Sequence, residues 1–362
     1  MKKMVRAAAL AGVVALALAA CGEAPEETPP GDTATTEDAA ADFTGCMVTD
    51  AGGVDDRSFN AAAYAGLTAV EEEKGITVQL VESTSDADYA PNISQLVQQD
   101  CGLIVTVGFL LATATAEAAA ANPEEKFALI DSTLEKPLEN VKPLLFNTAE
   151  AAYLAGYVAA GMTKTGTVAT FGGVPIPPVT IFMDGFSDGI AAFNEARGTD
   201  VQLLGWDKAA QDGTFTGNFD DQAAGKQLTE SFIQQDADII FPVAGPVGLG
   251  AAAAAQESGG EVNLIWVDSD GYESAAQFKS LFITSVLKNI DVAVADATNA
   301  AIDGSYTSDP YVGTLENDGV GLAPYHDFED AVPADLAAEV EALKEQIISG
   351  EVVVESQATP QS

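Results

Sequence analysis

The sequence predicts an α/β protein with two doubly wound parallel-sheet lobes joined by a hinge. Three observations lead to this fold class. Short apolar runs alternate with helix-like runs, which is the pattern of a parallel sheet covered by helices. The alternation occurs twice along the chain in the same layout. About 320 residues follow the N-terminal segments, more than one hydrophobic core usually serves.

The first series of elements begins near Phe43. Its apolar runs predict strands at 46–51, 76–83, 103–109 and 127–132, and its helix-like runs predict helices at 60–74, 91–99 and 111–121. The run PLLFNT at 143–148 then leads into the second series. The chain is expected to return to this lobe later with a helix at 290–302 and a strand at 311–314. We therefore assign residues 43–147 and 285–318 to the N-terminal lobe.

The second series repeats the first. A long helix at 150–162 opens it, and strands are expected at 167–173, 201–207, 238–245 and 264–270, with helices at 184–197, 220–235 and 247–257 between them. A last helix at 333–348, followed by the run GEVVV, is expected to close this lobe. The C-terminal lobe would then consist of residues 148–284 and 319–356.

The first 21 residues are typical of a lipoprotein signal peptide. Three basic residues begin it, residues 7–17 are apolar but too few to span a bilayer, and Leu18-Ala-Ala-Cys21 forms a lipobox. Cys21 would be the lipidated first residue of the mature protein. Residues 22–42 are rich in acids, prolines and threonines, which predicts a disordered tether. We expect a cell-membrane protein on the extracytoplasmic face, attached only through its lipid anchor.

The composition is strongly acidic. The formal net charge is −40, from 55 acidic and 15 basic residues. Such a surface repels the phosphates of nucleic acids and anionic lipid headgroups, which excludes nucleic acid as a partner. We hypothesise that the acidity reflects a saline habitat. A melt without any gain in stability from molar salt would contradict this hypothesis.

Two cysteines remain after the signal peptide. Cys46 begins the first predicted strand, and Cys101 begins the run CGLIVTVG that contains the third. These strands are neighbours in the common 2-1-3-4 order of parallel sheets. Both cysteines would lie at the same sheet end. We favour a disulfide over two separate buried thiols; full labelling of both by a thiol reagent in the unreduced, unfolded protein would refute it.

The candidate site lies where the strands end, because ligands of open parallel sheets bind beyond the carboxyl ends of the strands. These loops contain carboxylates, hydroxyls, an amide, glycines and aromatic rings, which suit a neutral polyol or nucleoside better than an anion. No cofactor or metal is expected. The loops are Asp50–Asn60, Gly108-Phe109, Asp131-Ser132, Gly172-Gly173, Trp206-Asp207, Gly245–Gly248 and Asp268–Asp270.

Enzyme motifs are weak in this chain. Gly185-Phe-Ser187-Asp-Gly189 matches the G-x-S-x-G of nucleophile elbows, but no strand directly precedes it and the single histidine is His326. One histidine leaves no good zinc site. The glycines from Gly245 to Gly250 lack the spacing of a dinucleotide fingerprint and favour close backbone approach to an uncharged ligand. We therefore expect a binding protein and no enzyme.

A resemblance rests on several motifs. GGVDDRSFN at 52–60, YAPNI at 89–93, DCGLIVTVGFLLA at 100–112, FALID at 127–131, DIIFPVAGPVGLG at 238–250, VDSD at 267–270 and VLKN at 286–289 resemble the basic membrane protein family. These are substrate-binding lipoproteins of ABC importers with the type I periplasmic-binding-protein fold, and similar members bind purine and other nucleosides. The resemblance implies a monomer that delivers a nucleoside to permease subunits. A sugar or autoinducer receptor and a surface nucleoside hydrolase remain as alternatives.

The resemblance also implies roles for particular residues. Phe59 would stack on the base, Asp131 would meet the base edge, and Asp268 and Lys288 would hold the ribose hydroxyls. The first-lobe site would further contain Asp55, Ser58 and Asn60. Phe109 lies in a strand-end loop of the first lobe and Gly245 in one of the second, and Trp206 or Phe182 would be the second-lobe partner of Phe59.

Each of these residues also has a structural explanation. Asp55 and Asn60 could only cap the helix that follows. Phe59 and Trp206 could belong to the core, and the two strand-end aspartates could be turn residues. Lys288 falls in a predicted helix, where a lysine is usually solvated.

Overall fold

The computed structural model describes residue 40 and residues 42–360. All of them belong to a compact unit that spans Thr36–Ser362. The predicted signal peptide with Cys21, and most of the predicted tether, lie outside the described residues. Within the described ranges, no helix is both long and apolar enough to cross a membrane.

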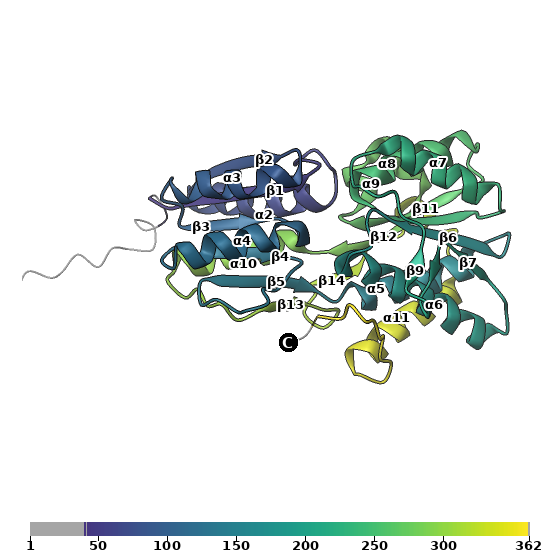
Figure 1. The fold of residues 1–362 in the computed structure, drawn as a ribbon. Coiled ribbons are helices and arrows are strands. Elements are labelled where there is room, and N and C mark those ends of the chain that lie inside the picture. Colours follow the sequence, from purple (N-terminus) through teal and green to yellow (C-terminus); the bar gives the residue numbers. More distant parts are fainter. Residues whose placement is uncertain (1–39, 41, 361–362) are drawn as a thin grey trace, which may run out of the picture. The chain divides into compact units, whose positions relative to one another are not determined.

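The first sheet has six strands in the order β13-β5-β4-β3-β1-β2, all paired in parallel (Figure 1). The strand order 2-1-3-4 is the one that the sequence predicted, and the late strand β13 joins this sheet as expected. The strands are β1 (Thr44–Ala51), β2 (Thr77–Ser83), β3 (Leu103–Thr106), β4 (Phe127–Ile130), β5 (Val141–Phe146) and β13 (Tyr311–Gly313).

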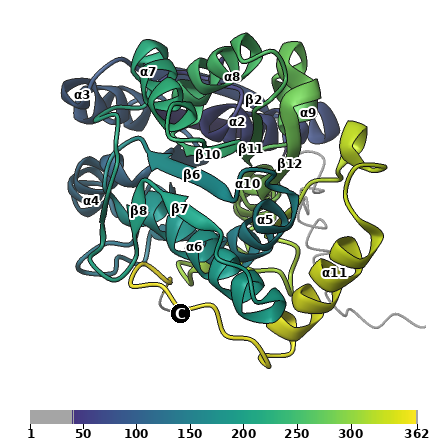
Figure 2. The same ribbon diagram turned by 90° about the vertical axis from the view of Figure 1, so that its right-hand side faces the viewer.

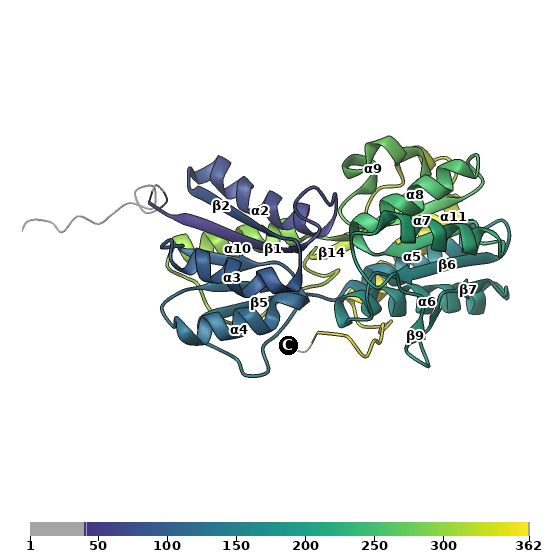
Figure 3. The same ribbon diagram turned by 45° about the horizontal axis from the view of Figure 1, so that its top comes forward.

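Helices cover both faces of the first sheet. Side chains alternate along β1, so that Met47 packs into the core that contains Leu67 of α2, whereas Val48 packs into the core that contains Ile93 of α3. Helices α2 and α10 also pack against each other (Figure 3). The helices of this part are α2 (Phe59–Lys74), α3 (Asp86–Val97), α4 (Ala112–Ala121) and α10 (Ile290–Ile302), with the short 3-10 helix η1 (Phe109–Leu111).

The second sheet has six strands in the order β14-β12-β11-β10-β6-β7. All pairings are parallel except that of β14, which runs antiparallel to β12. The strands are β6 (Thr167–Gly172), β7 (Gln202–Leu204), β10 (Ile239–Val243), β11 (Asn263–Asp268), β12 (Phe282–Lys288) and β14 (Val320–Leu322), and a separate ribbon pairs β8 (Trp206–Asp207) with β9 (Asp212–Gly213).

The helices of the second sheet also form two layers. Helices α7 and α8 pack together above it in Figure 1, and α5 and α6 pack together below it. The last long helix, α11, contacts α5 (Figure 2). Their bounds are α5 (Thr148–Met162), α6 (Pro177–Arg197), α7 (Gln222–Ile233), α8 (Gly248–Glu257), α9 (Gly271–Ser274) and α11 (Ala334–Ile348), with 3-10 helices η2 (Gly245–Val247), η3 (Ala276–Leu281) and η4 (His326–Phe328).

Three sequence expectations need correction. The strand β12 was not predicted, although its run FITSVLK is rich in apolar and β-branched residues. Residues 285–288 therefore lie in the second sheet and not in the first lobe, and Lys288 ends a strand and not a predicted helix. Helix α3 begins at Asp86, before the expected position 91, and helix α6 begins at Pro177, because prolines fit the first turn of a helix.

The G-x-S-x-G match lies inside helix α6. A Cβ atom on Gly185 would lie 2.2 Å from the carbonyl oxygen of Ala149, and one on Gly189 would lie 1.9 Å from that of Tyr153. These two glycines therefore allow the backbones of α5 and α6 to approach closely. The motif has a packing explanation and does not sit on a strand-to-helix turn.

Cys46 and Cys101 form a disulfide, with their Cα atoms 5.9 Å apart. Cys46 lies in β1, and Cys101 lies just before β3, which is the neighbour of β1. The bond therefore joins adjacent parts of the first sheet near the amino ends of these strands. The strand-end loops lie at the opposite, carboxyl ends.

The chain passes between the two sheets at residues 146–148, 288–290 and 313–320. The backbone N–H of Asn147 donates to Gly313 O at 2.8 Å, and that of Asn289 donates to Gly319 O at 3.0 Å. A Cβ atom on Gly319 would lie 2.2 Å from Cα of Gly313. These crossings thus lie side by side and form the hinge.

Candidate ligand-binding site

A pocket lies between the carboxyl ends of the two sheets. The space between its walls, including a part that is open to solvent, measures about 610 Å³. Strand-end loops of both lobes line it, as the sequence predicted from the strand pattern. Its walls are Asp50, Ala51, Asp56, Phe59, Asn60, Gly108, Phe109, Leu110, Asp131, Ile176, Pro178, Val179, Phe182, Phe219, Val243, Ala244, Gly245, Pro246, Val267, Asp268 and Lys288.

Asp56 fixes the start of helix α2. Its carboxylate accepts hydrogen bonds from the backbone N–H groups of Ser58, Asn60 and Ala61 at 3.0, 2.7 and 2.9 Å. Helix N-termini carry unpaired N–H groups and a positive dipole end, so a carboxylate there is favourable. Asp56 thereby places Phe59 and Asn60, the first two residues of α2, at the pocket wall.

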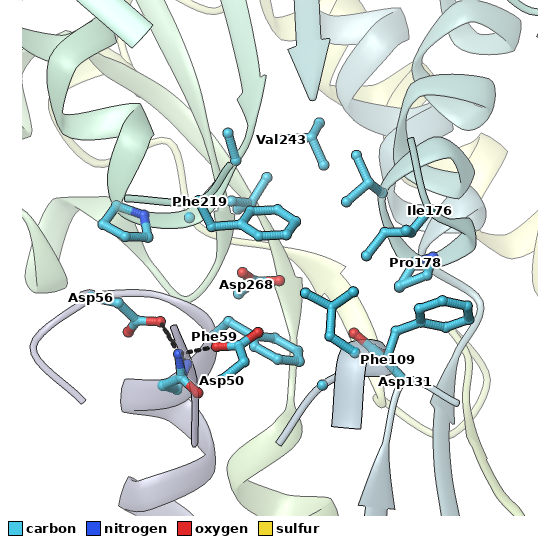
Figure 4. Close-up of a pocket in the computed structure, with 18 of the residues that line it drawn as sticks. Asp50, Asp56, Phe59, Phe109, Asp131, Ile176, Pro178, Phe219, Val243 and Asp268 are labelled. Atoms are coloured by element: carbon cyan, nitrogen blue, oxygen red, sulfur yellow. Dashed lines mark hydrogen bonds between the residues drawn. The ribbon is translucent and has the colours of Figure 1, made fainter. Parts of the chain in front are cut away.

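Asn60 links two carboxylates and keeps one oxygen unpaired. Its Nδ2 donates to Asp50 Oδ1 at 2.8 Å and to Asp56 Oδ2 at 3.2 Å (Figure 4). These acceptors determine the orientation of the amide, because a flipped amide would place its oxygen against two carboxylates. The buried Asn60 Oδ1 receives no hydrogen bond from any described residue. It is a ready acceptor for a donor group of a ligand.

Two strand-end aspartates adopt the left-handed backbone conformation. Asp131 follows β4 and Asp268 ends β11, and each has a φ of 65°. Aspartate tolerates this conformation better than most residues, and it turns the chain sharply out of the sheet. Both side chains are largely buried in the pocket wall.

Lys288 is the one basic side chain among the described residues that line the pocket. Its ammonium group forms a buried ion pair with Asp131. It also lies 4.9, 5.3 and 5.8 Å from the ring centroids of Phe59, Phe146 and Phe182. A cation over aromatic faces is favourable, and the rings also exclude water from the ion pair. Lys288 ends β12 of the second sheet, and Asp131 follows β4 of the first. The ion pair therefore joins the two lobes.

The pocket concentrates negative charge. Burial raises the pKa of the Asp50 carboxyl to about 7, although the hydrogen bond from Asn60 opposes this shift. Burial also raises the pKa of Asp56 to about 6, against the opposing backbone N–H bonds. The pKa values of Asp131 and Asp268 are raised by burial as well, and the nearby Lys288 ammonium opposes both shifts. Four carboxyls therefore share one cation, and this field favours a ligand that brings hydrogen-bond donors.

Aromatic rings form two opposite walls. Figure 4 shows Phe59 on one side of the pocket and Phe219 on the other, with Asp268 between them in this view. Phe182, one of the two predicted second-lobe candidates, also lines the pocket and is 2% exposed. A flat ring held between aromatic faces can stack on them.

Glycine is favoured at two strand ends that line the pocket. Gly108 follows β3 with a φ of 113°, and a Cβ atom there would lie 2.9 Å from Asp50 Oδ2. Gly245 follows β10 with a φ of 54° and lines the pocket. Both conformations favour glycine over other residues.

Most of the predicted site residues meet at this pocket. Seven of them line it, namely Phe59, Asn60, Phe109, Asp131, Gly245, Asp268 and Lys288. Ser58 lies directly behind the wall, where its Oγ donates to Asp268 Oδ2 at 2.5 Å. Two further contacts join the same segments at the rim. Arg57 Nη1 donates to Ser274 O at 2.9 Å, and Ser269 Oγ donates to Arg57 O at 3.0 Å.

Asp55 was predicted to contact the ligand, and the structure corrects this prediction. It is exposed and does not line the pocket, whereas its neighbour Asp56 is buried and does. Adjacent residues in a turn point in different directions, and the three backbone N–H donors at the start of α2 select Asp56. The sequence DDR does not show which aspartate faces inward.

Trp206 was a predicted second-lobe partner of Phe59, and the structure corrects this prediction as well. Its indole N–H donates to Asp184 Oδ1 at 3.0 Å inside the second lobe, and the residue does not line the pocket. The cause is Gly205, whose φ of 87° turns the chain out of the main sheet after β7. A Cβ atom there would lie 1.9 Å from Thr170 O, so only glycine fits.

Sequence reasoning missed three charged or aromatic wall residues. Asp50 was within a predicted strand-end loop but was not selected as a ligand contact. Asp55 was selected in place of Asp56. Phe219 lies in an irregular stretch between β9 and α7, where no strand end marks it. The pair Gly172-Gly173 was the available signal, because a Cβ atom on Gly173 would lie 2.2 Å from the Phe219 ring.

Within the described residues, no group of three or more His, Cys, Asp and Glu side chains is arranged to hold a metal ion.

Known proteins resemble this chain over most of its length. Residues 43–358 match the family described as "ABC transporter substrate-binding protein PnrA-like". A "CD4+ T-cell-stimulating antigen" of Listeria innocua is 32% identical over 373 residues, which cover 98% of this chain and 99% of that protein. The "ABC transporter nucleoside-binding protein BmpA" of Lactococcus lactis is 31% identical over 333 residues, with 87% and 90% covered.

A solved structure gives the same result for the fold. The crystal structure of an ABC transporter solute-binding protein from Aeropyrum pernix K1 has a TM-score of 0.80 to this chain at 29% identity. The match covers 88% of this chain and 94% of that one. The architecture is that of the type I periplasmic-binding proteins.

Proposed function

Since the chain belongs to the PnrA-like family of ABC transporter substrate-binding proteins, we propose that it binds a nucleoside in the pocket between its lobes and delivers it to a membrane permease. Purine nucleosides are the first candidates. No covalent step is proposed, so the ligand would be released from the pocket chemically unchanged.

One observation carries the proposal. The pocket combines opposite aromatic walls, Phe59 and Phe219, with a ring of carboxylates and the unpaired Asn60 Oδ1. A nucleoside offers a flat ring for the walls and hydroxyl or ring N–H donors for the acceptors. A phosphorylated ligand would bring further negative charge to a pocket whose described lining has a single ammonium group, so the unphosphorylated form fits better.

The proposed roles divide the pocket. Phe59 stacks on the base, and Asp131 faces its edge. Asp268 and Lys288 hold the ribose hydroxyls. Closure of the lobes about the hinge then brings the two sets of contacts together around the ligand.

The proposal also covers location and partners. The lipobox supports attachment of the mature chain through Cys21 to the extracytoplasmic face of the cell membrane. Residues 22–42 would serve as a tether between the lipid and the folded unit. A monomer with this attachment could reach the permease subunits of an ABC importer by diffusion in the membrane plane.

A thermal shift screen tests the proposed ligand. Nucleosides are expected to raise the melting temperature of the purified protein, whereas free ribose, pentoses and hexoses are not. Stabilisation by a sugar without stabilisation by any nucleoside would point to a sugar receptor instead. Free base that accumulates during long incubation with a nucleoside would point to a hydrolase.

Substitutions test the proposed site. Asp268→Ala should leave a ligand hydroxyl unpaired and weaken binding by about 1 to 3 kcal/mol. Phe59→Ala should weaken binding by a comparable amount through lost stacking. Asp55→Ala is the control, because Asp55 is exposed beside the same loop. Calorimetric titration that finds equal affinity in all three variants and the parent protein would discard the site.

A further inference from the structure

The segment that follows α11 is fixed to the second lobe. Ser356 Oγ donates to Asp184 Oδ2 at 2.6 Å and accepts from the backbone N–H of Ala358 at 3.0 Å. Lys208 Nζ donates to the carbonyl oxygen of Glu355 at 2.5 Å. The segment has no regular secondary structure, so these side-chain contacts determine its path.

The anchor of this segment is a fully buried carboxylate. Asp184 lies within helix α6 and is 0% exposed. Its Oδ1 accepts from Trp206 Nε1 at 3.0 Å and from Gln211 Nε2 at 2.9 Å, while its Oδ2 accepts from Ser356. Burial of a charge is costly unless several donors surround it. The site therefore uses the Ser356 hydroxyl as one of the donors that Asp184 requires.

The anchored segment reaches a hollow beside the ligand pocket. Phe109, Asp131 and Pro178 line both spaces, so these three side chains form the partition between them. The rest of the hollow has apolar side chains and neutral hydroxyl or amide groups. Its remaining walls are Ser132, Thr133, Leu145, Phe146, Pro177 and Ile181 from the two lobes, and Gln357, Ala358, Thr359 and Pro360 from the segment.

We infer that this hollow is a side chamber of the ligand site and that residues 357–360 are the wall that limits its size. The inference rests on the proposed function, in which the base edge faces Asp131. A substituent on that edge would point toward the partition and the chamber behind it. The apolar and hydroxyl-bearing walls suit an uncharged substituent, and the segment determines how large that substituent can be.

Thiol labelling tests the geometry without any ligand. Ser132 is 6% exposed and lines the chamber but not the pocket. In the full chain with Cys21→Ser, we expect a Ser132→Cys thiol to react slowly with a maleimide, and about tenfold or more faster once residues 355–362 are removed. Thr229→Cys in α7 is the matched control, because Thr229 is fully buried elsewhere in the second lobe. Its labelling rate should not change.

Ligand selectivity tests the role. Full-length protein should bind adenosine better than N6-benzyladenosine, and removal of residues 355–362 should reduce this preference by about tenfold or more. Ser356→Ala releases only the anchor and leaves the bond from Trp206 to Asp184 in place. It should shift both readouts in the same direction by a smaller factor, and it keeps the test valid if the truncated chain does not fold.

The outcomes separate the two proposals. A labelling rate of Ser132→Cys that changes neither after truncation nor with Ser356→Ala would overturn the inference. A truncated protein that loses affinity equally for adenosine and N6-benzyladenosine would also overturn it. Failure of the full-length protein to bind any nucleoside would overturn the proposed function. In that case, faster labelling of Ser132→Cys would still support the segment as the wall of the chamber.

Discussion

Asp131 and Asp268 occupy equivalent places in the two lobes. Each lies at the carboxyl end of the strand at the third position of its sheet, counted from β13 or from β14, and each precedes a serine. Each has a φ of 65°. The two halves thus use one backbone solution to turn an aspartate from a strand end into the shared pocket.

The two aspartates differ in what compensates their charge. Asp131 in the first lobe pairs with the Lys288 ammonium of the second. Asp268 in the second lobe accepts from the Ser58 hydroxyl of the first, and the nearby Lys288 ammonium also favours its charged form. Both contacts cross between the lobes, but one joins opposite charges and the other joins a charge to a dipole. The repeated fold therefore sets where the carboxylates lie, and the partner residues determine how each responds to substitution.

The largest effect is expected when the shared cation is removed. Lys288→Met leaves Asp131 buried without its partner and should lower the free energy of unfolding by about 3 to 5 kcal/mol. Urea unfolding measures this loss. The double variant Lys288→Met with Asp131→Leu should regain part of the stability but no ligand binding, because it removes the uncompensated charge. A single variant as stable as the parent protein would show that the ion pair does not hold the lobes.

A direct comparison of the two aspartates comes next. Asp131→Asn leaves the buried Lys288 without a carboxylate and should cost about 2 to 4 kcal/mol of unfolding free energy. Asp268→Asn keeps an oxygen that accepts from Ser58 and should cost about 1 kcal/mol or less. Equal losses in urea unfolding would remove the distinction between the two sites.

Asp50 should contribute its own pH dependence to the stability of the folded protein. Its folded-state pKa of about 7 lies above the ordinary value of 3.8, so the folded protein binds more protons than the unfolded chain between these values. Stability from this group is therefore highest at low pH and falls as the pH rises toward 7, by on the order of 2 kcal/mol between pH 5 and pH 8.

Asp50→Asn should remove this part of the pH dependence. The measurement is the difference in unfolding free energy between parent and variant at each pH, with Asp55→Asn as the exposed control. Parallel pH curves for Asp50→Asn and the parent protein would contradict the assignment.

A similarly small effect is expected at Ser58, the hydroxyl partner of Asp268. Ser58→Ala removes the donor to Asp268 and should destabilise the unliganded protein by about 1 kcal/mol. Ser58→Thr keeps the hydroxyl and serves as the matched variant. If both substitutions lower the melting temperature equally, then the loss reflects packing and not the bond between the lobes.

The sequence predicted the architecture because its strongest signals are periodic. Apolar strand runs recur between helical runs, and this pattern fixed both sheets and the neighbouring positions of the cysteine-bearing segments. The strand β12 was not predicted, because its sequence also contains polar residues and leads directly into α10. The end of this sequence was therefore interpreted as the start of a helix. Lys288 was accordingly placed on the wrong element, although the family resemblance selected it.

The site was predictable where a strand end determines the position of a side chain. Phe109, Asp131 and Asp268 follow from that rule alone. Asp56 does not, since only the hydrogen bonds of the folded turn distinguish it from Asp55. Phe219 approaches from a loop with no periodic pattern, and its position depends on the space left by Gly173. Such tertiary neighbours are not encoded in local sequence.

The contacts of Arg57 and Ser58 with residues 268–274 join the two lobes through the protein's own side chains and backbone. Under the proposed function, a bound ligand adds its own contacts to these and increases the population and the lifetime of the closed form. A permease that detects the closed form would then respond to how long that form lasts.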